Sequence, residues 1–334
     1  DEAFTDRDLE QTPDLTGAQT IAASDGADVH ITEEGTYVLS GSAADVTVYV
    51  EAEGAKVQLV LDGLTLVNSE APCIYVQSAD KVFVTTTADS SLSVTGEFTD
   101  DGDGVIFSRD DLVLNGTGTL TILSTDNGVV GKDDLKVTGG AYVIDAADCC
   151  LDANDSVRIA GGSLTLTAGN DGIHAENSDD DTLGYVYVSD GQLTVRAGDD
   201  AIHALSLVQI DGGSFSIAAG EGIEGTYVRI NGGTIVIESW DDGVNGAQKS
   251  SAYRATIEIN GGELTILMSS GDTDAVDCNG DLIINGGTVN ITGMSSFDYD
   301  GTGQYNGGTL IVNGQQLTSL PSQMGMGGGR GGRW

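Results

Sequence analysis

Acidic side chains recur at one place in a series of short turns along the second half of the chain. The turns read AGNDG, AGDDA, AGEGI, SWDDG and SGDTD, and aligning them puts the acids into three columns. We predict these residues of the columns as metal ligands: Asp148, Asp152, Asn170, Asp171, Asp199, Asp200, Glu221, Glu224, Asp241, Asp242, Asn245, Asp272, Asp274 and Asp277. Because calcium prefers carboxylate, amide and backbone oxygens, the columns predict calcium sites.

The spacing of the columns supports calcium over simple turn chemistry. A single Asp-Gly pair is an ordinary turn signal, but equivalent positions of stacked strands lie only about 4.8 Å apart. Carboxylates at that separation repel one another, and a calcium ion that contacts two of them removes the repulsion. The turn with Glu221 is one residue shorter than the others, and we place Glu221 in the first column beside Asp199, which leaves a gap in the second column.

Two histidines occupy the third column in neighbouring repeats. His174 follows Asp152, and His203 precedes Glu224. A zinc site needs more than two imidazoles. We therefore expect these rings to stack or to hydrogen-bond to the adjacent acids.

A repeated Gly-Gly sets the position of these turns and predicts the fold. Its second glycine, or the equivalent residue, falls at Gly118, Gly140, Gly162, Gly191, Gly213, Gly233, Gly262, Gly287 and Gly308. The intervals are 20 to 29 residues, rich in strand-forming residues, which is typical of a β-solenoid. We predict an all-β protein, a single-stranded, right-handed parallel β-helix with an N-terminal cap.

The predicted organisation has three parts. They are a leader or cap over 1–30, the β-helix over 31–315 and a flexible Gly-rich tail over 316–334. Within the β-helix, coils 31–105 are atypical and coils 106–312 carry the Gly-Gly repeat. Two coils have insertions, at 177–182 and 247–253, and insertions in a solenoid map to one face that often binds the ligand.

The charge excludes several classes of partner. The chain has 52 Asp and Glu against 13 Lys and Arg, a net charge of −39, so nucleic acid, which needs clustered basic residues, is excluded. We also expect no membrane span, because no apolar run approaches the roughly 18 residues required.

We expect a monomer with four buried free thiols, at Cys73, Cys149, Cys150 and Cys278.

Several ordered motifs resemble one known family. SADKV, FSRDDLVLNGTGTL, KDDLKVTGG, AGNDGIHAE, GEGIEG, WDDGVNGA and FDYDG resemble the secreted bacterial carbohydrate-binding domain-containing β-helix family, whose fold is similar to that of calcium-dependent pectate lyases. The resemblance implies a secreted or cell-surface protein that binds polygalacturonate (pectin) or cellulose with calcium. The sequence departs from the family pattern at Cys149-Cys150 and at Gly198–Ala201, which puts single calcium sites in question.

Three functions remain open, and the sequence favours a binder. A pectate lyase needs a basic residue that removes a proton from the uronate, and Lys249 and Lys132 are the candidates. Neither has a pattern that marks a catalytic base, so we expect no enzymatic activity, with the lyase as the alternative. A structural or adhesive surface module without a glycan ligand is the third. The expected carbohydrate contacts are Trp240, Tyr253, Tyr227 and Lys249.

Overall fold

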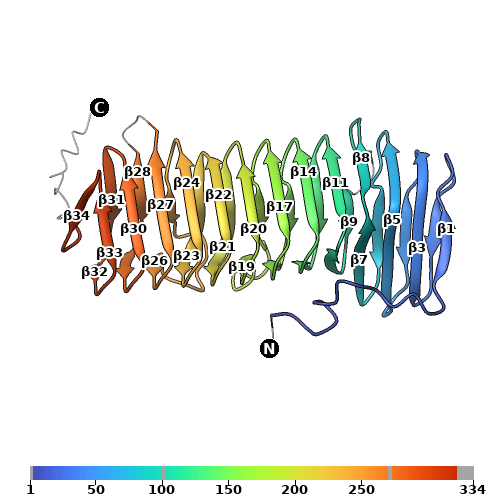
Figure 1. Ribbon diagram of the computed structural model, residues 1–334, viewed down its shortest axis with the longest axis horizontal. Coiled ribbons are helices and arrows are strands. Elements are labelled where there is room, and N and C mark those ends of the chain that lie inside the picture. The colour runs from blue at the N-terminus through green and yellow to red at the C-terminus, as the bar shows by residue number, and fades with distance from the viewer. Residues whose placement is uncertain (1–2, 100–101, 270–272, 322–334) are drawn as a thin grey trace, which may run out of the picture.

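The protein is a long solenoid of β-strands. The computed structural model describes residues 3–99, 102–269 and 273–321, and the regular elements of these residues are all strands. They wind into about 12 turns, stacked along one axis (Figure 1). Apart from one antiparallel strand at the C-terminal end, the strands pair in parallel with the equivalent strand of the next turn, as β14 (Ala141–Ala146) does with β17 (Ser163–Ala168). The predicted fold class, a parallel β-helix, is confirmed.

The strands form three rows, one for each side of the solenoid. Row 1 contains β2 (Val29–Ile31), β4 (Val48–Glu51), β6 (Ile74–Ser78), β9 (Gly104–Ser108), β12 (Asn127–Gly131), β15 (Leu151–Ala153), β18 (Ile173–Ala175), the first halves of β21 (Asp200–Ile210) and β23 (Glu221–Ile230), β25 (Val244–Gly246), β28 (Asp274–Cys278) and β31 (Ser295–Tyr299).

Row 2 contains β1 (Gln19–Ala22), the first halves of β3 (Gly35–Ala44) and β5 (Lys56–Asn68), β7 (Lys81–Ala88), β10 (Asp111–Gly116), β13 (Asp134–Val137), β16 (Ser156–Ile159), β19 (Tyr185–Val188), the second halves of β21 and β23, β26 (Thr256–Ile259), β29 (Asp281–Ile284) and β32 (Gly303–Tyr305).

Row 3 contains the second halves of β3 and β5, β8 (Ser90–Val94), β11 (Thr119–Ser124), β14, β17, β20 (Gln192–Arg196), β22 (Ser214–Ala219), β24 (Thr234–Ser239), β27 (Glu263–Met268), β30 (Thr288–Thr292) and β33 (Thr309–Val312). β34 (Gln315–Leu317) closes this row as an antiparallel strand. It spans the boundary between the predicted β-helix, 31–315, and the predicted tail, 316–334. Residues 322–334 lie outside the described residues.

Alternation along each strand builds one core through all turns. In β17, Leu164 and Leu166 point inward and are buried, whereas Ser163 and Thr165 are exposed, as expected when successive side chains point to opposite faces. The inward positions stack from turn to turn into one hydrophobic cluster that runs the length of the solenoid. All four cysteines are free and buried, which confirms the expectation from the sequence.

Each corner of the solenoid has its own kind of turn. The row 2 to row 3 corner carries the Gly-Gly pair, and its second glycine has a positive φ, for example 103° at Gly162. Only glycine adopts this conformation without strain. The row 3 to row 1 corner carries the acidic turns. The row 1 to row 2 corner carries both long insertions, which touch where Ser251 N donates to Asp181 Oδ2 (2.9 Å).

The described segment before β1 runs along the outside of row 2 (Figure 1). Asp8 is fully buried there, between Lys81 of β7 (3.4 Å) and Lys136 of β13 (3.2 Å). Arg158 Nη1 of β16 donates to Ala3 O (3.2 Å). The coils themselves start at β1, earlier than the predicted start at residue 31, because Gln19 already pairs with β3.

Candidate functional site

The outward side chains of row 1 form the third predicted column. Asp152 lies in register with His174 of β18, and His174 with His203 of β21. The column continues through Glu224, Asn245, Asp277 and Asp298. Because row 1 is in register through all these turns, it holds polar side chains about one strand spacing apart on one face.

The second column contains Glu221, which corrects the alignment made from the sequence. Glu221 is in register with Asp200, and Gly220 takes the place in the first column, where its carbonyl accepts from Asp241 N (2.9 Å). Row 3 pairing aligns Ala219 with Ser239, so the missing residue of the short coil must fall in the turn itself. The predicted gap in the second column does not exist.

Neighbouring rungs of the second column are joined by hydrogen bonds. Asp171 Oδ1 accepts from Asp200 N (2.9 Å), and Asp242 Oδ1 accepts from Asp274 N (3.1 Å). Each of these carboxylates keeps a second oxygen for another partner. The second column therefore orients its acids through the backbone and leaves oxygen ligands available.

The first column lies in the row 3 to row 1 corner. Asn170 N donates to Asp148 O (3.3 Å), and Asp199 N donates to Asn170 O (3.1 Å). Asp199 and Asp241 are exposed, and Asp148 and Asn170 are half-buried. These side chains stand at the outer edge of the turns, where they can supply additional oxygen atoms. Asp272 lies outside the described residues.

A dense cluster of charges occupies the middle of the columns. Carboxylate oxygens of Asp200, Glu221 and Glu224 lie within 4.8 Å of one another. His203 Nδ1 contacts Asp200 Oδ2 (2.8 Å) and Glu224 Oε2 (2.9 Å). Lys249 Nζ, from the second insertion, also donates to Glu224 Oε2 (2.5 Å). The chain thus partly neutralises this cluster with its own cations.

The two glutamates of the cluster differ in pKa because only one of them has cationic partners. Burial, together with the Glu224 and Asp200 carboxylates, outweighs the hydrogen bond from the Asn245 amide and raises the pKa of Glu221 to about 8. Burial also favours protonated Glu224, but hydrogen bonds from His203 and Lys249 outweigh it and lower that pKa to about 2. Burial disfavours charged His203, but its bonds to Asp200 and Glu224 raise its pKa to about 9.

A second acidic group lies toward the C-terminal end. Burial raises the pKa of Asp242 to about 6, with further contributions from the Asp277, Asp241 and Asp274 carboxylates. The pKa of Asp277 is raised by burial and by Asp274 and Asp298. Among the ion pairs of the described residues, none joins Asp242, Asp274 or Asp277 to a basic side chain. Oxygen donors without a counter-ion are the environment that calcium requires.

The predicted carbohydrate contacts divide between two margins of row 1. Trp240, half exposed, stands at the row 3 to row 1 corner. Lys249 and Tyr253 belong to the opposite corner, where Tyr253 packs edge-to-face on Tyr227 (5.8 Å between ring centroids). The structure therefore does not gather the four residues into one patch. It places the acidic columns between them, and both margins are available to a ligand that lies across row 1.

Lys132, the other candidate base, is also paired. Its Nζ lies 4.0 Å from Asp152 Oδ2 and 5.6 Å from the centre of the Phe107 ring. An ammonium group that contacts a carboxylate has no lone pair with which to take a proton from a substrate. The same reasoning applies to Lys249.

Comparison with known proteins identifies the family. The family of carbohydrate-binding domain-containing proteins matches residues 25–273 and 218–318. The chain belongs to this family. A carbohydrate-binding domain-containing protein of Acetivibrio thermocellus is 36% identical over 129 residues, 36% of this chain and 45% of that protein, so the match spans about half the length of this curated relative.

One solved structure has a fold similar to that of this carbohydrate-binding protein. It is a polysaccharide lyase-like protein from C. thermocellum, solved as a gadolinium derivative. The match covers 73% of this chain and 99% of the chain of the solved structure, with 30% sequence identity and a TM-score of 0.57.

The described residues contain no helix that is long and apolar enough to cross a membrane.

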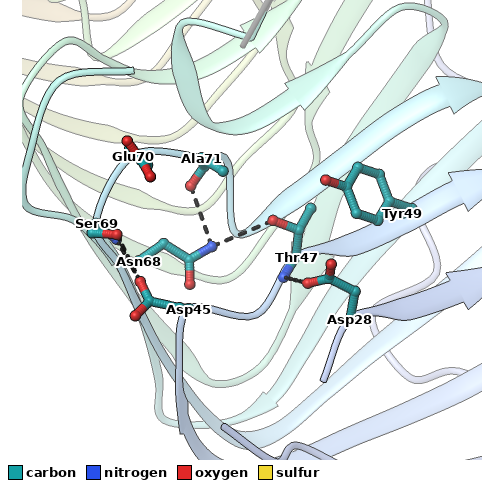
Figure 2. A pocket seen from close by; sticks show the side chains of 8 residues that line it. All are labelled: Asp28, Asp45, Thr47, Tyr49, Asn68, Ser69, Glu70 and Ala71. Carbon is teal, nitrogen blue, oxygen red and sulfur yellow. Dashed lines mark hydrogen bonds between the residues drawn. The ribbon is translucent and has the colours of Figure 1, made fainter. Parts of the chain in front are cut away.

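One hollow of this family member was not predicted from the sequence. It has a volume of about 320 Å³ and is lined by Asp28, Asp45, Thr47, Tyr49, Asn68, Ser69, Glu70 and Ala71 (Figure 2). Tyr49 belongs to the third column, because it pairs in register with Tyr75, and Tyr75 with Phe107. The hollow is thus on the face of the acidic columns, in the atypical coils whose turns lack the acidic motif.

Glu176 also contacts the third column and was not predicted from the sequence. It follows His174 by two positions, so it points to the same side of the chain. Its Oε2 lies 3.6 Å from His174 Nε2 and 3.9 Å from His203 Nε2. The spacing of two residues could have revealed it, but Glu176 lies beyond the three columns that were aligned.

Proposed function

We propose that this carbohydrate-binding protein holds a polysaccharide across row 1 with the help of calcium, outside the cell or at its surface. The observation that carries the proposal is the unbroken second column, Asp171, Asp200, Glu221, Asp242 and Asp274, in one register. Because burial and neighbouring carboxylates raise the pKa of Asp200, Glu221 and Asp242, a bound cation would stabilise the charged forms of these three side chains.

The charge of the protein explains why calcium is needed for an acidic glycan. Polygalacturonate is a polyanion, and a protein with a net charge of −39 repels it. A calcium ion coordinated on one side by the columns can bind uronate carboxylates on the other. Asp242, Asp274 and Asp277 are the ligands we favour, with Asp171 and Asp200 as a second set. Pectin is therefore the favoured ligand.

Cellulose is the second candidate ligand, and the hollow beside Tyr49 supports it. A neutral glycan needs an aromatic surface and groups that accept hydrogen bonds from its hydroxyl groups, rather than a bridging cation. Asp28 and Asp45 supply carboxylates there, and each already accepts from a backbone N–H, of Thr47 and Ser69 respectively. These bonds fix the carboxylates while leaving oxygen atoms for sugar hydroxyl groups.

Binding to immobilised polygalacturonate, with calcium and with a chelator, tests the proposal. We expect retention that is lost on chelation and restored by calcium. Asp242→Asn combined with Asp274→Asn should weaken calcium-dependent retention at least tenfold, whereas Asp62→Asn, the same change at an exposed position of β5, should not. Retention that is equal in chelator and in calcium would contradict the role of calcium.

The same samples distinguish the other two functions. A lyase would produce an unsaturated uronide that absorbs ultraviolet light, and Lys249→Met or Lys132→Met would abolish this absorbance. We expect none in the wild type, because both lysines are paired with carboxylates. A purely structural or adhesive module would bind neither polygalacturonate nor cellulose under any condition.

A further inference from the structure

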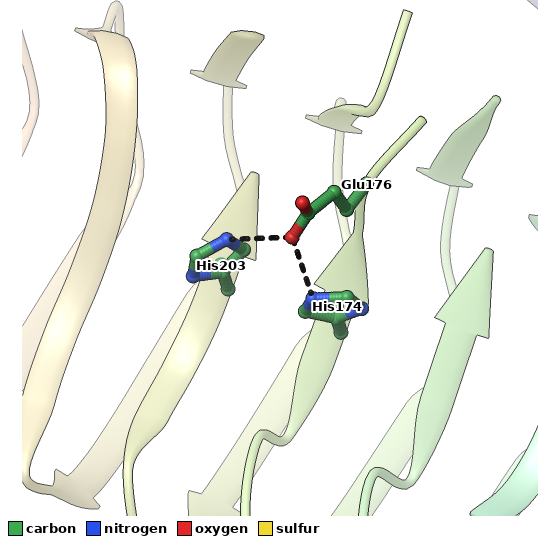
Figure 3. Close-up of side chains that lie close together, drawn as sticks. All are labelled: His174, Glu176 and His203. Carbon is green, nitrogen blue, oxygen red and sulfur yellow. Dashed lines mark ion pairs between the residues drawn. The ribbon is translucent and has the colours of Figure 1, made fainter. Parts of the chain in front are cut away.

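Two histidines and a glutamate converge on the outer surface of row 1. The rings of His174 and His203 stack with their centroids 4.9 Å apart. Glu176 extends over the edge of both rings, toward their Nε2 atoms (Figure 3). One ligand atom from each of the three side chains lies within 4.8 Å of the others. The sequence predicted the stacking but not the shared carboxylate.

Carboxylates hold the opposite nitrogen of each ring. His174 Nδ1 lies 2.7 Å from Asp152 Oδ1, and His203 Nδ1 contacts Asp200 and Glu224 as described above. Because a carboxylate only accepts, the proton of each neutral ring resides on Nδ1, and the lone pair resides on Nε2. Carboxylate-bound histidines that present Nε2 in this way are the usual arrangement around protein-bound metals.

The Nε2 atom of His203 is the observation that points to a ligand. It is buried and has no hydrogen-bond partner among the described residues, and the residue is only 7% exposed. Buried polar atoms without a partner are rare, because desolvation costs free energy that nothing offsets. Glu176 is half exposed, so an ion can reach the site from solvent and keep water in its remaining positions.

We propose that His174, His203 and Glu176 bind one divalent transition-metal ion of the zinc type. Imidazole nitrogens suit zinc, nickel or cobalt, whereas calcium requires oxygen atoms. The site is therefore chemically distinct from the calcium columns, although Asp200 and Glu224 border both. Zinc–nitrogen bonds of about 2.0–2.1 Å require the two Nε2 atoms and the Glu176 carboxylate to move closer together around the ion. The ion takes the place of any proton on Nε2.

Zinc titration of the chelator-treated, full-length protein tests this site, with a coloured zinc indicator as competitor. We expect one equivalent of zinc to bind and cobalt to give the visible absorption of a coordinated ion. His174→Gln and Glu176→Gln should weaken binding at least tenfold. His30→Gln is the matched control, because His30 belongs to the same column and contacts a carboxylate, Glu51 (2.9 Å), but its ring stacks on Tyr49.

Three outcomes would overturn the site. They are no saturable zinc binding, equal binding by wild type and His174→Gln, and displacement of zinc by a moderate excess of calcium. The site is independent of the proposed glycan function, so the two can fail separately. Asp274→Asn, which should weaken calcium binding, is expected to leave zinc binding unchanged, and Glu176→Gln should leave calcium-dependent retention on polygalacturonate unchanged.

Discussion

Asp200 lies directly opposite Glu221 in the next turn of the solenoid. With this pairing, every member of the second column is followed three residues later by a member of the third. The pairs are Asp171 and His174, Asp200 and His203, Glu221 and Glu224, Asp242 and Asn245, and Asp274 and Asp277. The short coil therefore continues both columns, and Glu221 adds a half-buried carboxylate to the second column, where the sequence alignment had left a gap.

Replacing Glu221 with glutamine should stabilise the calcium-free protein. Burial and the nearby carboxylates raise the pKa of Glu221 to about 8, so its charged form is unfavourable. At about 1.4 kcal/mol per pKa unit, the shift from 4.5 to about 8 sets an upper limit of about 5 kcal/mol at pH 9. Because the side chain is only half-buried, solvent screens part of this effect, and we expect Glu221→Gln to stabilise the folded protein by roughly 1–2 kcal/mol. Added calcium should stabilise this variant less than it stabilises the wild type. Thermal melting by circular dichroism measures both changes.

The control for this substitution is Glu238→Gln, the same change at an exposed position of β24. It should alter neither the melting temperature nor the calcium response. A calcium-free Glu221→Gln protein that melts below the wild type would show that the carboxylate is not the source of repulsion.

Asp133 should make stability depend on pH near neutrality. Burial, with contributions from Asp111 and Asp155, raises its pKa to about 6 from 3.8. The folded state therefore binds more protons than the unfolded state, so the stability from this group is fully present below pH 4 and is lost as pH rises through 6. We expect Asp133→Asn to melt higher than the wild type at pH 7.5, by the equivalent of about 1 kcal/mol, and nearly equally at pH 4.5. A benefit of the same size at both pH values would exclude this titration.

Adjacent glycines in one corner should respond differently to alanine. Gly162 has a φ of 103°, and an added Cβ would lie 3.0 Å from Gly140 O. At Gly161 the nearest atom would be 3.7 Å away. We expect Gly162→Ala to lower the free energy of unfolding by about 1–3 kcal/mol, and Gly161→Ala to lower it by less than about 1 kcal/mol. Hydrogen exchange of β17 and its neighbours should reveal the local loss, because each coil of a solenoid contacts mainly its neighbours. Equal protection in the two variants would contradict the backbone argument.

Asp8 should control whether the N-terminal segment stays on row 2. Hydrogen bonding to Thr5 and the charges of Lys136 and Lys81 lower its pKa against the effect of burial. Removing one partner of a buried ion pair costs about 3–5 kcal/mol, but the segment can lift away and hydrate Lys136 instead. We expect Asp8→Ala to speed tryptic cleavage after Arg7 at least fivefold while the coils melt as before. Asp14→Ala, at an exposed position, is the control, and unchanged cleavage in Asp8→Ala would show that other contacts hold the segment.

The periodic part of the structure could be predicted from the sequence because each coil repeats the same local rules. Gly162 and its equivalents need a positive φ, alternating residues such as Leu164 and Thr165 separate core from solvent, and both signals recur at one interval. Stacking then follows, since a single coil cannot bury its apolar side alone. For the same reason the third column, from Asp152 to Asp277, could be predicted by alignment.

What depends on strand pairing or on contacts between distant segments needed the tertiary structure. The register of Glu221 is decided by the pairing of β21 with β23, which a one-residue deletion hides from alignment. Lys249 reaches Glu224 from a loop 25 residues away, and Glu176 meets His203 of the next turn. Periodicity determines which residues face outward, but side-chain reach and loop path decide which of them meet, because those depend on packing in three dimensions and not on the interval of the repeat.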